Sequence, residues 1–197
     1  MPAPRPFSAA SKSRTLAAAL ALALCGAPAA FGDAATVPEY AAKAAFLLNI
    51  AKYATWPPQA FADSSAPVVI GILGDDPFGG ALDRVVSGRV INDRRVVVRR
   101  SKRAADLRGA HVVFIASSES ERAAGICAGL AEGGSLCVGD TESTAAVTAI
   151  NFSVESGKIV FSVNLAAVRR ANVAISSKLL QLAKNVTGKP VGERVRL

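Results

Sequence analysis

Three stretches of the chain are largely apolar throughout, and each runs into a segment of glycine, serine or aspartate. They span residues 68–73, 111–116 and 135–140. A strand that meets water on one face alternates apolar and polar residues, whereas a strand covered on both faces reads as a continuous apolar run. The pattern therefore predicts parallel strands inside an α/β sheet.

Apolar residues at helical spacing lie between and around these strands. Residues 41–54 gather apolar side chains on one face and place Lys43 on the other, which predicts an amphipathic helix with Lys43 facing water. After the first strand, Asp76 suits a helix N-cap and Pro77 the first helical position. Further helical segments are predicted at residues 81–86, 105–109, 121–132, 142–147 and 175–186.

The pattern changes near the C-terminus, where apolar and polar residues alternate. Apolar and polar residues alternate along 150–155, which predicts a strand. Ser156-Gly157 suits a turn, and residues 158–164 form the second strand, which runs back beside the first. This predicts an antiparallel hairpin at the edge of the sheet. The predicted fold is therefore α/β, a mostly parallel, Rossmann-like three-layer sheet with helices on both faces and a C-terminal antiparallel hairpin.

The N-terminal segment has the pattern of a secretory signal peptide. Basic residues end at Arg14, an apolar run follows at residues 16–24, and small residues lead to Ala34. The apolar run is too short to span a bilayer. We expect residues 1–34 to be removed on export to the periplasm and residues 35–197 to form a single domain. The chain carries a net charge of +8, part of which leaves with this segment.

Export bears on the cysteines, because the periplasm is oxidising. Cys25 would leave with the signal peptide, so that Cys127 and Cys137 remain. Two alternatives stay open for this pair, a disulfide bond or two buried thiols. A metal site is not expected, because His111 is the only histidine and is not near either cysteine in sequence.

Polar residues follow the ends of the apolar strands, where ligands sit in open α/β sheets. We expect a binding rim at which Asn164 joins them if the hairpin register allows it; the rim residues are Gly74, Asp75, Asp76, Ser117, Ser118, Glu119 and Asp140. The adjacent carboxylates argue against a phosphate ligand. Because the chain has no Walker lysine, G-x-G-x-x-G or G-x-S-x-G motif, no cofactor and no enzymatic activity are expected, although Asp75 with Asp140 could form an acid–base pair.

Aromatic and basic residues elsewhere suggest a surface for a partner. Trp56 could contact a partner or belong to the core. Two arginine pairs, Arg99-Arg100 and Arg169-Arg170, could belong to a partner surface. For the cluster around Arg99, an acidic partner and anionic lipid headgroups both stay open. Nucleic acid is not expected, because no aromatic residues for base stacking interleave with the basic cluster around residue 99.

With these segments in view, the chain resembles the YfiR-like family of exported bacterial regulators. The resemblance covers nearly all of the mature chain. It rests on the order and spacing of short motifs at residues 39–40, 43–47, 56–57, 74–79, 98–100, 111–115, 118–119, 150–152, 164–165, 169–170 and 175–180.

The resemblance implies a periplasmic α/β protein without enzymatic activity. The characterised type binds the periplasmic domain of an inner-membrane diguanylate cyclase and holds it inactive, which lowers cyclic-di-GMP and biofilm formation. An outer-membrane lipoprotein can sequester that type, which also has a disulfide near its last strands, where residues 150–163 here have no cysteine. Homodimerisation stays open. The alternative is a periplasmic module that binds a small molecule at the rim.

Overall fold

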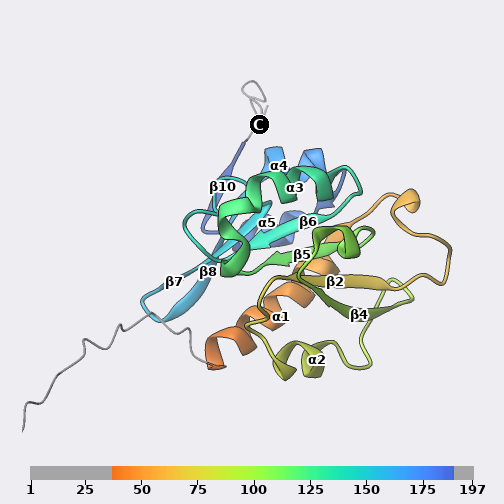
Figure 1. Cartoon of the computed structure of the whole chain (residues 1–197), viewed down its shortest axis with the longest axis horizontal. Helices are drawn as coiled ribbons and strands as arrows, with labels where there is room; N and C mark the ends of the chain where they lie inside the picture. The colour runs from red at the N-terminus through yellow and green to blue at the C-terminus, as the bar shows by residue number, and fades with distance from the viewer. Residues whose placement is uncertain (1–36, 189–197) are drawn as a thin grey trace, which may run out of the picture. The chain divides into compact units, whose positions relative to one another are not determined.

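The computed structural model describes residues 37–188. The predicted signal peptide, and a mobile tail expected at residues 191–197, lie outside this range. The main sheet has eight strands in the order β10-β8-β7-β6-β5-β2-β4-β3 (Figure 1). Its centre is formed by β4 (Arg94–Ser101), β2 (Val68–Leu73), β5 (Val112–Ile115) and β6 (Leu136–Gly139), all parallel. The predicted mostly parallel sheet is confirmed.

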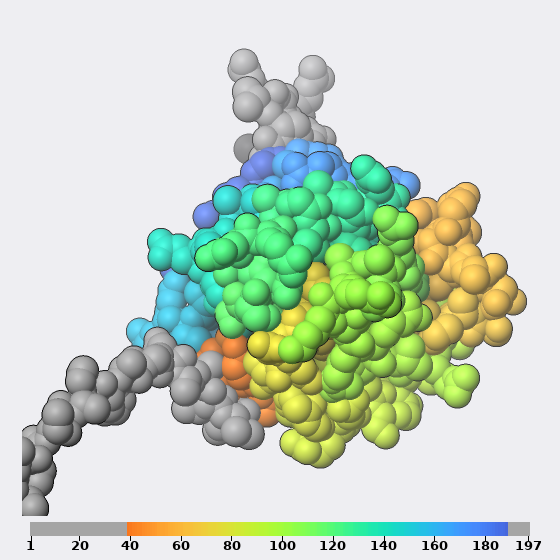
Figure 2. Space-filling model, viewed as in Figure 1, coloured from red at the N-terminus to blue at the C-terminus, as the bar shows by residue number. Residues whose placement is uncertain are grey.

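The continuous apolar runs arise because both faces of the central strands are covered. All six residues of β2 are buried. Ile70 and Ile72 belong to a core cluster shared with α1 (Val37–Tyr53), whereas Val69 and Leu73 belong to a second cluster shared with α3 (Ala123–Ala131). The two helices lie on opposite faces of the sheet (Figure 1), and Figure 2 shows the green segment that contains α3 over one face. The three-layer arrangement is thus confirmed.

Short elements complete the described part of the chain. The 3-10 helices are η1 (Pro58–Ala60), η2 (Ala104–Leu107) and η3 (Ser117–Arg122). A separate two-stranded sheet pairs β1 (Ala54–Thr55) with β9 (Ala174–Ile175), and β3 (Val90–Ile91) forms one edge of the main sheet. No helix within residues 37–188 combines the length and the apolar character that a membrane crossing requires.

The predicted hairpin is confirmed, but it does not form the edge of the sheet. It consists of β7 (Ile150–Glu155) and β8 (Lys158–Asn164), joined by Ser156 and Gly157 at φ 49° and 74°. Two positive φ angles in a row are typical of a type I′ turn, whose twist matches that of the strands. The strand β10 (Asn185–Thr187) pairs in parallel with β8 and takes the edge position.

Several predicted helices differ in the structure. The helix α2 (Gly80–Val86) begins after Gly79, because Asp76 instead accepts a hydrogen bond from the Phe78 amide (2.8 Å) and forms a tight turn. Residues 142–147 form hydrogen-bonded turns and not a helix.

The single helix predicted at residues 175–186 was also wrong. This region contains the end of β9, then α5 (Ser177–Leu182) and β10, and it is preceded by a separate helix, α4 (Leu165–Arg170). Asn172, at φ 52°, ends α4, and the Ser176 hydroxyl caps α5. The apolar residues fit one helical stripe, but the chain bends twice and pairs with strands that are distant in sequence.

Candidate functional site

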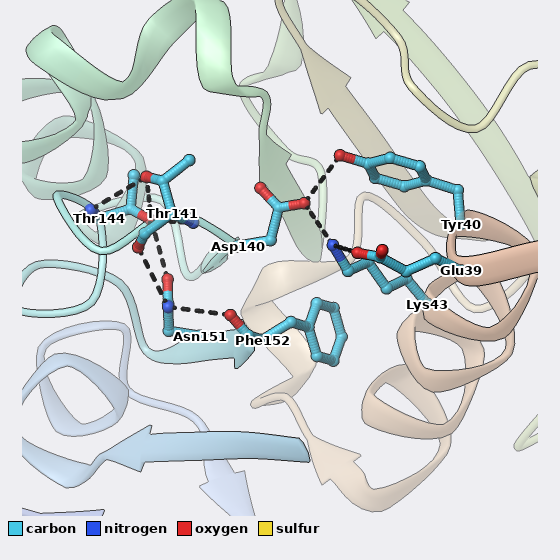
Figure 3. Close-up of polar contacts among 8 residues, drawn as sticks. All are labelled: Glu39, Tyr40, Lys43, Asp140, Thr141, Thr144, Asn151 and Phe152. Atoms are coloured by element: carbon cyan, nitrogen blue, oxygen red, sulfur yellow. Dashed lines mark hydrogen bonds and ion pairs between the residues drawn. The ribbon is translucent and has the colours of Figure 1, made fainter. Parts of the chain in front are cut away.

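A buried ionic cluster lies at the carboxyl end of β6 and ties this end of the sheet to the start of α1 (Figure 3). Asp140 directly follows β6, and its Oδ2 accepts hydrogen bonds from the Tyr40 hydroxyl (3.0 Å) and from Lys43 Nζ (2.7 Å). Lys43 Nζ also lies 2.6 Å from Glu39 Oε1, one helical turn earlier. The cluster therefore fixes the position of α1 on the sheet.

Burial makes these contacts mutually dependent. The Lys43 and Asp140 side chains are only 4% and 5% exposed. A buried charge is costly unless an opposite charge and hydrogen bonds compensate it. Burial, together with the negative charge of Asp140, raises the pKa of Tyr40 well above its usual range, so the phenol stays protonated and donates to Asp140. The cluster acts as an ionic lock between α1 and the sheet.

A second polar network follows Asp140 in the chain and rests on β7. The Thr144 hydroxyl donates to Asn151 Oδ1 (2.8 Å), and Asn151 Nδ2 donates to the carbonyls of Thr141 and Phe152 (3.2 Å each). At Gly139, a Cβ atom would lie 2.3 Å from Thr144 Oγ1, so only glycine fits there. The network holds the loop that carries Asp140.

Two of the loops that carry the predicted rim lie against each other. The loops after β2 and β5 meet, because the Ser118 hydroxyl accepts from the Asp75 amide (3.0 Å). A Cβ atom at Gly74, which has a φ of 97°, would lie 2.4 Å from the same hydroxyl. Tyr40 connects this region to Asp140, because its hydroxyl donates to Asp140 and its ring packs edge-on against the Phe78 ring, with centroids 5.3 Å apart.

The acidic residues of the rim are paired with basic residues. Arg100 binds Asp76 and Asp83 (2.7 Å each), and Lys102 binds Asp75 (2.8 Å). Arg122 binds Glu119. Ser117 is exposed at the start of η3. The rim is therefore a set of neutralised loops and not a concentration of negative charge.

Asn164 was predicted for this rim if the register allowed, and the register does not allow it. Because β8 is antiparallel to β7, Asn164 lies beside Ala149, and its backbone amide donates a hydrogen bond to the Ala149 carbonyl (2.8 Å). Its side-chain Oδ1 accepts from the amides of Ala166 and Ala167 and caps α4. Asn164 has a structural role at a different place.

The suggested partner residues lie in two places, because Trp56 and Arg169 line the same hollow whereas Arg99 and Arg100 belong to β4. Trp56 belongs to the core: it is 8% exposed, and its indole donates to the Gly134 carbonyl (2.9 Å). Arg100 is held by the carboxylates of Asp76 and Asp83, whereas Arg99 points its guanidinium to backbone carbonyls. Arg169 and Arg170 are exposed at the end of α4, on a different part of the fold from β4.

Cys127 of α3 and Cys137 of β6 are buried thiols, so the disulfide alternative is not what the structure contains. They are neighbours nonetheless. A hydrogen bond between the two side chains lowers the pKa of Cys127 and raises the pKa of Cys137.

Sequence reasoning missed the ionic lock. It placed Lys43 on the water-facing side of the first helix, but Lys43 is 3% exposed. One signal could have found it: Glu39 and Lys43 are four residues apart and form a helical ion pair. The partner Asp140 lies 97 residues away and had no such signal.

His111 is a buried, neutral side chain at the start of β5. Its Nδ1 accepts from the Val69 amide (3.0 Å), and its ring stacks on Phe61 with centroids 4.4 Å apart. Within residues 37–188, its Nε2 is the one buried side-chain atom without a hydrogen-bond partner. Burial, helped by the charge of Arg94, lowers the pKa of His111 to about 4.

This pKa shift predicts acid sensitivity. The unfolded chain, with an ordinary histidine pKa of 6.5, binds the proton more readily than the folded chain, so stability is full above pH 6.5 and falls as the pH drops toward 4. The expected loss between pH 7 and pH 4 is about 2–3 kcal/mol. Urea unfolding across this range should show it. In His111→Asn, which keeps an acceptor for Val69, this part of the pH dependence should vanish; parallel curves for both proteins would contradict the assignment.

Comparison with known protein families identifies one family that this chain matches. A family model described as YfiR/HmsC-like matches residues 40–184. No curated protein matches the chain. Among solved structures, a conserved domain protein from Vibrio cholerae O1 biovar El Tor is 10% identical, covering 61% of this chain and 55% of that one, with a TM-score of 0.45. The ABC domain in complex with L-Trp from Streptococcus pneumonia is 7% identical, with 60% and 55% covered and a TM-score of 0.44. The chain spans about half the length of these two proteins.

Proposed function

Because the chain belongs to the YfiR/HmsC-like family, we propose that it is a periplasmic regulator that binds the periplasmic domain of an inner-membrane diguanylate cyclase and holds the cyclase inactive. The match over residues 40–184 is the observation that carries this proposal. Lower cyclic-di-GMP and less biofilm would follow. The role is one of binding and not of catalysis.

The mechanism is a shift of population between two states of the cyclase. A protein that binds the inactive state more tightly than the active state moves the equilibrium toward the inactive one. Repression of several-fold requires a difference in binding free energy of only about 1–3 kcal/mol. An outer-membrane lipoprotein that captures the regulator would release the cyclase.

The surface that we propose for the cyclase lies at the amino end of the parallel strands. There, the segment after β1 faces the end of α4 across two adjoining hollows of about 480 and 260 Å³. Both hollows are lined by Pro57 and Asn172, and we call them together the Pro57 groove. Arg169 lines one hollow, and Arg170 lines the other together with Glu132. The lining thus carries two positive charges and one negative charge, and the excess of positive charge favours an acidic partner surface.

Charge reversal in the Pro57 groove tests the proposal. In a strain that lacks the gene, a plasmid copy carrying Arg169→Glu and Arg170→Glu should fail to lower cyclic-di-GMP, because two exposed attractive charges become repulsive. The matched control is Arg95→Glu with Arg108→Glu, two exposed arginines on other elements. The control should repress as well as the natural protein. Equal repression by both variants, at equal periplasmic amounts, would remove the groove as the binding surface.

A further inference from the structure

The last three strands have one apolar face and one polar face. Phe152 and Phe161 pair across β7 and β8, and the Phe46 ring of α1 lies 5.9 Å from each of them. On the opposite face, Asn151 of β7 pairs with Ser162 of β8, and Ser162 pairs with Asn185 of β10. Three neutral polar side chains therefore form a row across three strands.

This polar row lines a hollow of about 330 Å³. A second pair in register, Asn164 with Thr187, extends the row, and the turn at residues 145–148 forms the opposite wall. The lining residues include neither a charged nor an aromatic side chain. We call this space the asparagine hollow. Its volume is at the lower end of the range for sites that hold a small ligand.

The walls of the asparagine hollow are held in place. Asn151 is 7% exposed, and its amide is fixed by Thr144 and by two backbone carbonyls. Asn164 caps α4 and donates to the Ala146 carbonyl (3.1 Å), which joins the strand to the turn. Ser162 is half-buried and Asn185 is exposed, and within residues 37–188 neither of these two side chains has a hydrogen bond to another residue. The fixed walls thus leave a hydroxyl and an amide beside each other.

We propose that the asparagine hollow binds a neutral ligand rich in hydroxyl and amide groups, namely one ring of an N-acetylated sugar. Amide and hydroxyl side chains both donate and accept hydrogen bonds, as sugar hydroxyls and an acetamido group require. A charged ligand would lose hydration in a lining that offers no opposite charge. The site is separate from the Pro57 groove and does not depend on the proposed function.

The test is a titration of the purified mature protein with N-acetyl-D-glucosamine, followed by amide chemical shifts and by calorimetry. We expect saturable binding in the millimolar range, with shifts centred on β8, β10 and the turn at residues 145–148. Ser162→Ala with Asn185→Leu should weaken binding by about ten-fold or more, since two hydrogen-bonding groups are lost. Ser153→Ala, an exposed serine of β7 outside the hollow, is the matched control and should bind normally.

Gluconate, a sugar acid of similar size, should bind much more weakly than N-acetyl-D-glucosamine. If the double variant does not fold, Asn185→Ala alone serves, because Asn185 is exposed at the sheet edge. Absence of saturation by N-acetyl-D-glucosamine, unchanged affinity in the variants, or equal binding of gluconate would each overturn the proposal.

Discussion

Lys43→Met is expected to lower the free energy of unfolding by about 3–5 kcal/mol, the cost of removing one partner of a buried ion pair. The substitution keeps the apolar stem but leaves the carboxylate of Asp140, 5% exposed, without its cation. Tyr40 can still donate one hydrogen bond, which does not replace a charge. Urea unfolding at neutral pH, followed by circular dichroism, measures the effect.

The double variant Lys43→Met with Asp140→Asn separates the ion pair from simple packing. Because Asp140→Asn removes the carboxylate that Lys43→Met leaves buried without a cation, the second substitution should restore a large part of the lost stability. Lys52→Met, on an exposed position of the same helix, is the control and should change stability by less than about 0.5 kcal/mol. Equal losses for Lys43→Met and Lys52→Met would show that the ionic lock does not stabilise the fold.

Trp56→Ala is expected to cost about 3–5 kcal/mol, as for other large aromatic residues removed from a core. The indole is 8% exposed, contacts the His111 ring edge-on at 5.3 Å, and donates to the Gly134 carbonyl. Trp56→Phe keeps most of the ring and loses the hydrogen bond, so it should cost about 1–2 kcal/mol.

Thermal and urea unfolding of both Trp56 variants decide between a core residue and a partner contact. If the Trp56→Ala protein were as stable as the natural chain but unable to repress the cyclase, Trp56 would be a partner contact and not a core residue.

Much of the fold could be predicted from the sequence, because the pattern of apolar and polar residues along a strand shows which of its faces are buried. The strand β2 has no polar residue, so it must be covered on both faces, and the Ser156-Gly157 pair suits the turn of the hairpin. The C-terminal region could not be predicted in the same way. Its apolar residues satisfy helical spacing, but pairing of β9 with β1 and of β10 with β8 overrides this local preference.

The site was less predictable than the fold, because its partners are distant in sequence. The loops after β2 and β5 could be brought together by the rule that parallel strands end at one edge. The pairing of Lys43 with Asp140 could not, since helical spacing alone places Lys43 off the apolar stripe. The sequence left Trp56 either in the core or at a partner contact, because its burial and its hydrogen bond to Gly134 depend on the tertiary fold.

The central claim is that this protein restrains a diguanylate cyclase, and intracellular cyclic-di-GMP tests it most directly. The nucleotide should be measured in the parent strain, in a strain without the gene, and in that strain with the gene restored. We predict a several-fold rise on deletion and a return to the parental level on restoration. An equal level in all three strains would contradict the account.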